Sequence, residues 1–292
     1  MLELPNPFAN EGGVIRLLER PGGDTEALVD SVLAKRYPRP FVIEDDGARC
    51  LYFTRDFIQS EMRLDDPFEL AFAYTRKMMA FLLFLPEPRA ILMLGLGGGS
   101  LAKWCHRHLP GARVTAVEID PDVIAFRDQF LVPPDGERFR VVRGDAAQYV
   151  AQCEEKADVV IIDAFDRHGV APALCTREFY RDVRAALSRG GVVAANLVGP
   201  KAERVAHLEM LRTVFEGNVI LLPIADDGNY VAFAFRDPAF EPRWRWMAGE
   251  ARALKARYGL DFPRLAARLE RSRKLGFLRR EMHAPDVQTR RL

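Results

Sequence analysis

From Ala90 to Phe235, short apolar segments alternate with segments of helical character, and this alternation constrains the fold more than any other feature of the sequence. Continuous apolar strands separated by helices are typical of a parallel sheet that is covered on both faces. We therefore predict an α/β fold with a Rossmann-like, mostly parallel sheet, whose last strands can pair antiparallel at one edge. The expected strands are Ala90–Leu94, Arg113–Val117, Phe139–Val142, Asp158–Ile162, Gly191–Asn196, Val219–Leu222 and Tyr230–Phe235.

Helix signals lie between these strands. Asp120 and Thr176 are suitable N-caps for helices that run to Phe130 and Leu187. Asp66 and Glu69 form a possible capping box for an earlier helix that would reach about Leu85. Two more helices are expected near Leu101–His108 and Ala202–Val214.

The segments outside this alternating region predict two additions to the sheet. Phe41–Phe53 contains an Asp-Gly turn between apolar runs, which indicates a β-hairpin, and Arg55–Met62 is expected to add a strand. The predicted organisation is a small β-rich domain over residues 1–64, the Rossmann-like domain over 65–240, and a basic helical extension over 241–292.

The composition excludes several classes of protein. The 292 residues are 49% hydrophobic and 28% charged, which is typical of a globular protein with a sizeable core. The four cysteines form no C-x-x-C pair, so a disulfide framework or a zinc site is not expected, and a reducing cytoplasm fits. The longest apolar run, Met78–Leu85, is too short to span a bilayer and the N-terminus lacks a signal-peptide pattern. We expect a soluble, cytoplasmic protein that does not bind membranes.

The charge is unevenly distributed along the chain. The formal net charge is only +1, but the last 52 residues hold 14 lysines and arginines against six acidic residues. We interpret this segment as a solvated amphipathic face that packs on the domain or on a neighbouring subunit. Nucleic-acid binding is not expected, because few aromatics beyond Trp244 and Trp246 lie between the basic residues.

The residues that follow the strands are the candidates for a ligand site, because ligands of open α/β sheets bind beyond the carboxyl ends of the strands. The glycine-rich turn Gly95–Gly99 lets the backbone approach a ligand closely. Glu118 lies 23 residues beyond Gly95, at the end of the next strand, where a carboxylate can accept hydrogen bonds from both ribose hydroxyls. Together they indicate a nucleoside.

Two features favour an adenosyl sulfonium over a nicotinamide dinucleotide. Ser100 stands where the strict dinucleotide pattern has glycine or alanine. Asp145 follows the third strand, where a carboxylate can accept a hydrogen bond from the adenine amino group.

Asp163 and Asp166 follow the fourth strand, where the reacting end of such a ligand would lie. An alkylammonium with a pKa of about 10.4 has no lone pair, so it must lose a proton before its nitrogen can attack a sulfonium carbon. Two carboxylates three residues apart can converge on one amine, and we expect one to anchor it and the other to relay the proton. Asp166 can instead cap a turn, and His168 is a further candidate base.

These residues resemble the spermidine synthase (polyamine aminopropyltransferase) family from Phe57 to Phe235. The resemblance implies a methyltransferase-like (class I) Rossmann domain, decarboxylated S-adenosylmethionine as the group donor, and methylthioadenosine as the by-product. It also implies a di- or polyamine acceptor and a homodimer or tetramer. It rests on Ile58-Gln59, Tyr74, Leu94–Ser100, Val117–Asp120, Gly144-Asp145, Asp158–Asp163 and Leu174–Tyr180.

By position, the resemblance implies that Glu118 holds the ribose and that Asp145, with Ala146 beside it, holds the adenine. Asp163 would be the acid–base residue, and Asp166 and Tyr74 would position the amine. No metal is implied. The remaining residues implied for the nucleoside pocket are Gln59, Gly95, Gly97, Gly98, Gly99 and Ser100.

The chain departs from the family pattern in three places. Ser100–Ala102 replaces Asp-Gly-Gly, whose aspartate normally lies beside the aminopropyl ammonium. Arg167 and His168 are new in the loop after the fourth strand, and the family's later Tyr-Pro segment has no clear match. Two alternatives therefore stay open. One is a methyl- or aminocarboxypropyltransferase that uses intact S-adenosylmethionine, and the other is a non-catalytic nucleoside-binding relative.

Overall fold

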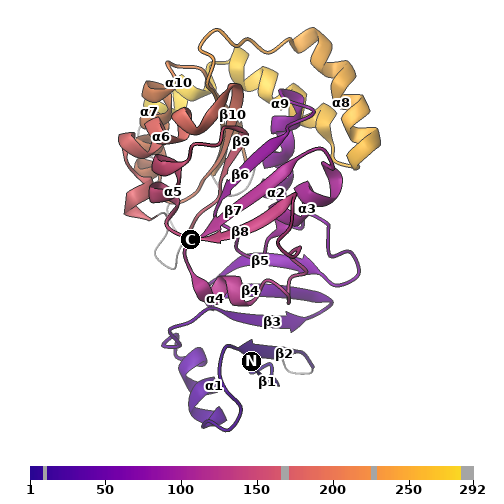
Figure 1. Ribbon diagram of the computed structural model, residues 1–292, viewed down its shortest axis with the longest axis vertical. Coiled ribbons are helices and arrows are strands. Elements are labelled where there is room, and N and C mark those ends of the chain that lie inside the picture. Colours follow the sequence, from indigo (N-terminus) through magenta and orange to yellow (C-terminus); the bar gives the residue numbers. More distant parts are fainter. Residues whose placement is uncertain (9–11, 166–170, 225–228, 284–292) are drawn as a thin grey trace.

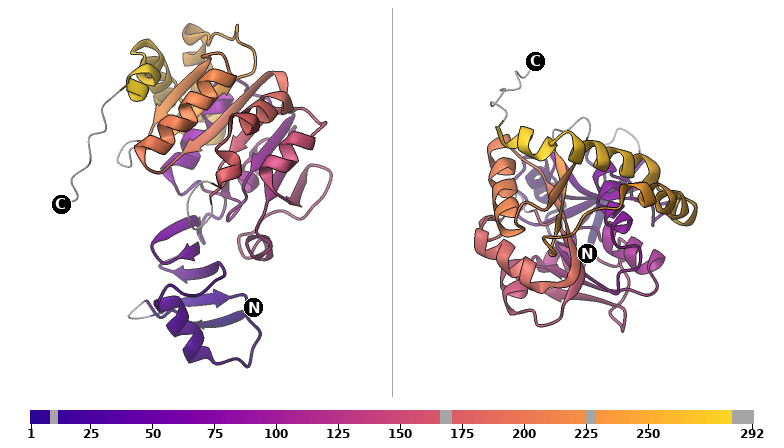
Figure 2. Two further views of the ribbon diagram at one scale, coloured as in Figure 1. Left: turned by 90° about the vertical axis from the view of Figure 1, so that its left-hand side faces the viewer. Right: turned by 90° about the horizontal axis from the view of Figure 1, so that it is seen from above.

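The structure is a computed structural model that describes residues 1–8, 12–165, 171–224 and 229–283. Its two sheets lie one beyond the other along the long axis, an antiparallel sheet of five strands and a mostly parallel sheet of seven (Figure 1). The C-terminal helices lie at the end of the large sheet that is opposite the N-terminal sheet, as the left view in Figure 2 shows.

The N-terminal sheet is a simple antiparallel meander in the order β1-β2-β3-β4-β5. The predicted hairpin joins β3 and β4 through Asp46 and Gly47, which have φ values of 47° and 73°. Two consecutive positive φ values are typical of a type I′ turn, which Asp-Gly favours. The elements are β1 (Leu2–Pro5), β2 (Val14–Leu17), α1 (Thr25–Leu33), β3 (Phe41–Asp45), β4 (Ala48–Thr54) and β5 (Phe57–Arg63).

The large sheet has the order β11-β12-β10-β9-β6-β7-β8. β12 runs opposite to the other six strands, so the predicted, mostly parallel sheet with an antiparallel pair at its edge is confirmed. The strand order reverses between the adjacent strands β6 and β9. The strands are β6 (Ala90–Leu94), β7 (Arg113–Glu118), β8 (Phe139–Arg143), β9 (Ala157–Ile162), β10 (Leu187–Leu197), β11 (Val219–Pro223) and β12 (Tyr230–Phe235).

Helices cover both faces of the large sheet. Ile91 and Met93 pack into one core and Leu92 and Leu94 into the other, which explains why β6 is apolar along its whole length. One face carries α2 (Ala73–Met78), η1 (Met79–Leu83), α3 (Ser100–His108), α8 (Trp244–Tyr258) and α9 (Phe262–Lys274). The other carries α5 (Ala146–Gln152), α6 (Arg177–Ala186) and α7 (Lys201–Val214).

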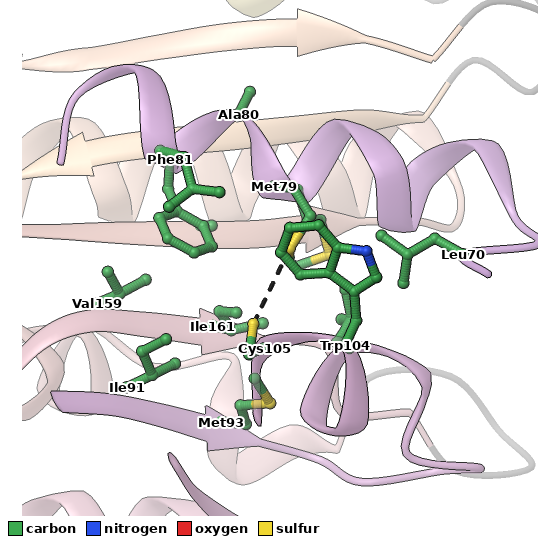
Figure 3. Packing of buried hydrophobic residues seen from close by; sticks show 14 of the residues in the cluster. Leu70, Met79, Ala80, Phe81, Ile91, Met93, Trp104, Cys105, Val159 and Ile161 are labelled. Carbon is green, nitrogen blue, oxygen red and sulfur yellow. Dashed lines mark hydrogen bonds between the residues drawn. The ribbon is translucent and has the colours of Figure 1, made fainter. Parts of the chain in front are cut away.

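Figure 3 shows the first of these cores. Trp104 and Cys105 of α3 pack between β6 and η1, and the sulfur atoms of Cys105 and Met79 lie 4.0 Å apart. The remaining short elements are α4 (Pro121–Ala125), η2 (Pro172–Leu174) and α10 (Phe277–His283).

Two predicted helices differ from the structure. Asp66–Glu69 forms a turn, and α2 begins only at Ala73. The carboxylate of Glu69 lies 3.3 Å from Nε of Arg63, so it pairs with that side chain instead of closing a capping box. The helix expected up to Phe130 ends at Ala125, after which the chain turns until Leu131, whose φ of 53° reverses its direction.

The basic C-terminal segment completes the core of the large sheet. Leu265 and Leu269 of α9 are buried against η1 and β11, as their spacing predicts, whereas Leu275 is exposed. Among the described residues, no helix is long and apolar enough to cross a membrane.

Candidate functional site

A cavity of about 800 Å³ opens at the carboxyl ends of the strands of the large sheet. Strand β5 of the N-terminal sheet forms part of the cavity wall. Glu118, Asp145 and Asp163, each of which lies at or just beyond the end of a different strand, all line this cavity. Gln59, Tyr74, Gly95, Gly97 and Ala146 line it too. The structure therefore brings most of the sequence-derived candidates to one site.

The glycine turn between β6 and α3 passes very close to the chain that leaves β9. Gly95 has a φ of 100°, and a Cβ atom at this position would lie 2.2 Å from the carbonyl oxygen of Asp163. Only glycine fits there, because both the backbone conformation and the contact exclude a side chain. Gly97, with a φ of 53°, continues the turn along the cavity.

The second half of the glycine turn faces the N-terminal sheet. The amide of Gly98 donates a hydrogen bond to Oγ of Ser60 at 2.8 Å, and the hydroxyl of Ser100 donates to the carbonyl of Glu61 at 3.4 Å. Gly98, Gly99 and Ser100 are not among the described residues that line the cavity. Gly98 and Ser100 thus contact the N-terminal sheet, and Ser100 also lines a smaller pocket together with Tyr74, Gly95 and Asp163. The role of the three residues in binding the nucleoside stays a prediction.

Glu118 is held by backbone amides. Oε2 accepts from the amide of Leu96 at 3.0 Å, and Oε1 accepts from that of Asp120 at 2.9 Å. Burial raises the pKa of Glu118, although these hydrogen bonds oppose the rise. The amide of Gly97 also donates to this carboxylate. A carboxylate has about four acceptor positions, so the fixed side chain can still accept a hydrogen bond from a ligand hydroxyl.

Asp145 is the N-cap of α5. Its Oδ1 accepts from the amides of Ala147 and Gln148 at 2.7 and 3.1 Å, so these bonds do not use Oδ2. The cap fixes the side chain at the edge of the cavity, next to Ala146.

Asp163 lies between two hydrogen-bond donors. Its Oδ1 accepts from Nδ2 of Asn196 at 3.0 Å, and its Oδ2 accepts from the hydroxyl of Tyr74 at 3.2 Å. Burial raises the pKa of Asp163 to about 6, against the lowering effect of these two bonds. Burial and the nearby carboxylate raise the pKa of Tyr74 well above its ordinary value, so the phenol keeps its proton. The carboxyl group is thus oriented and can take up a proton near neutral pH.

Asn196 is a site residue that the sequence analysis missed. Its side chain is 5% exposed, and its Oδ1 is buried without a hydrogen-bond partner among the described residues. Asn196 lies at the carboxyl end of β10, so inspection of the fifth strand end would have found it. Asp166 falls outside the described residues, as do Arg167 and His168.

The described lining of the cavity includes three carboxylates and no lysine or arginine. Phe57 and Ile119 expose 73% and 62% of their surfaces, and with Phe72 they add apolar walls. Such a lining favours a ligand that is cationic and partly apolar. Within the described part of the chain, no three His, Cys, Asp or Glu side chains are grouped as metal ligands.

Comparison with known proteins agrees with this geometry. The polyamine aminopropyltransferase of Neisseria meningitidis serogroup A is 38% identical over 81% of this chain and 90% of its own length. That of Chromobacterium violaceum is 38% identical over 80% of this chain and 90% of its own length. A spermidine synthase in complex with the transition-state analogue AdoDATO has the same fold, with a TM-score of 0.64 and 21% identity over 83% of this chain and 84% of that one.

The family described as spermine/spermidine synthase domain matches residues 71–216. This range runs from the start of α2 to the end of α7 and includes Tyr74, Glu118, Asp145, Asp163 and Asn196. The chain therefore belongs to the spermine/spermidine synthase family.

Proposed function

We propose that this chain is a polyamine aminopropyltransferase that moves an aminopropyl group from decarboxylated S-adenosylmethionine to an amine acceptor and releases methylthioadenosine. The observation that carries the proposal is the buried Asp163 carboxyl group, oriented by Asn196 and Tyr74 in the same cavity as Glu118 and Asp145. The names of the relatives with 38% identity support the same activity.

In this proposal the nucleoside lies over β6, β7 and β8. Glu118 accepts hydrogen bonds from the ribose hydroxyls, and Oδ2 of Asp145 accepts from the adenine amino group. Gln59, Gly95 and Gly97 complete this half of the cavity. The sulfonium then lies near the turn at Gly95, beside Asp163.

The acceptor amine enters as an ammonium ion, which the carboxylates of the cavity attract. Asp163 takes one proton from it, directly or through a water molecule, and thereby exposes the nitrogen lone pair. The nitrogen attacks the aminopropyl carbon, the new C–N bond forms, and the C–S bond breaks in line with it. The sulfur keeps the bonding pair and leaves as the neutral thioether methylthioadenosine. The buried Oδ1 of Asn196 accepts a hydrogen bond from the amine and positions it.

The decarboxylated nucleoside fits the described lining better than intact S-adenosylmethionine does. The intact molecule carries an additional carboxylate, and the described lining offers three carboxylates but no lysine or arginine to pair with it. We expect calorimetry to give a dissociation constant for the decarboxylated nucleoside at least about tenfold below that for the intact one. Tighter binding of the intact nucleoside would reject this donor and favour a methyl- or aminocarboxypropyltransferase.

The substitution Asp163→Asn tests the acid–base role. It keeps the shape of the side chain but removes the proton acceptor, so we expect kcat to fall by about 100-fold or more while methylthioadenosine still binds. Asp128→Asn, on an exposed turn, is the matched control and should keep full activity. Unchanged turnover of every amine by Asp163→Asn would show that Asp163 is not the base.

We further propose that the protein is a homodimer or tetramer, as the family resemblance implies, and that it lies in the cytoplasm, as its scattered cysteines indicate. Sedimentation analysis of the purified chain tests the first point, since a monomer at micromolar concentration would contradict it. Fractionation of the source cells tests the second.

A further inference from the structure

The cavity has a second half, on the side of Asp163 away from Glu118 and Asp145. Val198 and Gly199 follow β10, and Ile224 and Asn229 flank the connection between β11 and β12. On the proposed function this half receives the amine, because the nucleoside occupies the strand ends on the other side of Asp163. These four residues are called the acceptor wall below.

A buried arginine lies directly behind the acceptor wall. Arg204 of α7 donates a hydrogen bond to the carbonyl of Gly199, and its guanidinium lies 5.3 Å from the ring centre of Tyr230. Its side chain is 11% exposed, and its Nε is buried without a hydrogen-bond partner among the described residues. The wall thus has a poorly solvated positive charge at its back. The carboxylate of Glu203 also lies near Gly199, but Glu203 is exposed, so solvent screens its charge more strongly than that of Arg204.

The C-terminal helix α10 supplies a carboxylate to this charge. Oε1 of Glu281 lies 4.0 Å from Nη2 of Arg204, and the Glu281 side chain is only 12% exposed. Helix α10 packs beside α7 (Figure 1), and the ring of Phe277 meets that of Tyr230 edge-on at 5.7 Å. Burial, together with a hydrogen bond to Glu281, raises the pKa of Tyr230 to about 12. Glu281 is the carboxylate with which Arg204 pairs in the described part of the chain.

This pairing has an electrostatic consequence for the cavity. A charge of low exposure is weakly screened, so an unpaired Arg204 would project a positive potential through the wall at Gly199. A diammonium acceptor would be repelled at the place where it must bind. With Glu281 beside it, the pair is neutral overall and the attraction by the cavity carboxylates is preserved.

We propose that Glu281 is a specificity-determining residue that neutralises Arg204 behind the acceptor wall and so permits the binding of a polycationic amine. The C-terminal extension thereby becomes part of the amine site, although no residue of α10 lines the cavity among those described. This inference rests on the proposed function.

Steady-state kinetics of Glu281→Gln with 1,4-diaminobutane tests the inference. The variant keeps the shape of the side chain and its hydrogen bonding but removes its charge. We expect KM for the diamine to rise about tenfold, while kcat and the dissociation constant of methylthioadenosine change by less than about twofold. The rise in KM should shrink as salt is added, because salt screens the repulsion.

The double variant Arg204→Gln/Glu281→Gln separates charge from packing. It removes both charges but keeps an amide donor that can face Gly199, so KM for the diamine should return to within about twofold of the unaltered protein. Arg280→Gln, on the exposed side of the same helix, is the control and should leave KM unchanged. Thermal unfolding of each variant reports whether it is folded.

The outcomes are distinct. An unchanged KM in the folded Glu281→Gln variant, or a double variant as impaired as the single one, overturns the inference and leaves the proposed function standing. If the unaltered protein releases no methylthioadenosine with any amine, the proposed function itself fails, and the inference fails with it.

Discussion

At the scale of single residues, the protonation state of Asp163 controls the proposed chemistry. Its pKa is raised from 3.8 to about 6, so below pH 6 the group carries a proton and cannot act as a base. We predict that kcat/KM for the diamine rises as the pH increases through about 6. It should then stay level up to the pH at which the ammonium groups of the unbound diamine lose their protons. A pH series of initial rates measures this, and a profile that is flat from pH 5 to 8 would contradict it.

Asn196 is predicted to tune that profile. Its amide donates to Oδ1 of Asp163 and lowers the pKa of the carboxyl group. Asn196→Ala removes this bond, so the pKa of Asp163 should rise further and the acidic limb of the profile should move to higher pH by about half a unit to one unit. Asn218→Ala is the matched control, because Asn218 is also buried but bonds to the carbonyls of Asp237 and Phe240. An unmoved limb in Asn196→Ala would refute the tuning role.

The sequence is informative about residues whose place follows from strand ends, and less so about those placed by the N-terminal sheet. Glu118, Asp145 and Asp163 each lie at or just beyond the end of a strand, and the parallel sheet brings such positions together. The hydrogen bond from Ser100 to Glu61 was not predicted, and it forms because β5 lies against the glycine turn. No local pattern encodes that contact between distant segments.

At the scale of elements, the turn from β6 to α3 depends on Gly95. Gly95→Ala would place a methyl group 2.2 Å from the carbonyl oxygen of Asp163 and would strain a residue with a φ of 100°. We predict a loss of stability of about 2 kcal/mol or more, with weaker nucleoside binding, measured by denaturant unfolding and calorimetry. Gly111→Ala is the control, because a Cβ there meets no atom within 4 Å, and it should be nearly neutral. A Gly95→Ala variant as stable as this control would contradict the steric reading.

The strands of the large sheet and the longer helices were predictable because their apolar patterns are strong, whereas β1, β2 and α5 were not predicted. Helix α5 has seven residues and buries only Val150, so its sequence carries almost no periodic signal. Helix α2 begins later than the capping pattern predicts, and Glu69 pairs with Arg63, a contact that the capping pattern does not reveal.

At the scale of the whole molecule, the site depends on contact between the two sheets. The amide of Gly98 is satisfied by Oγ of Ser60, which lies on β5. Ser60→Ala leaves that amide without its partner, so we predict a loss of about 1–3 kcal/mol in stability and a rise in the dissociation constant of methylthioadenosine. Thr213→Ala, whose hydroxyl bonds within its own helix to Glu209, should change neither by a comparable amount. If the two substitutions changed stability and the dissociation constant of methylthioadenosine equally, the contact between Ser60 and Gly98 would not be important for the site.

The reversal of strand order between β6 and β9 also divides the strand ends of the large sheet into two sets, and the residues of each set can be substituted independently. One set of strand ends grips the nucleoside, on the proposed assignment, and the other set, backed by α7 and α10, faces the incoming amine. Substitutions could therefore accumulate behind the second set and alter which amine is accepted, while the hold on the common co-substrate is preserved. Such a division offers a practical route to redesigning amine preference one half at a time.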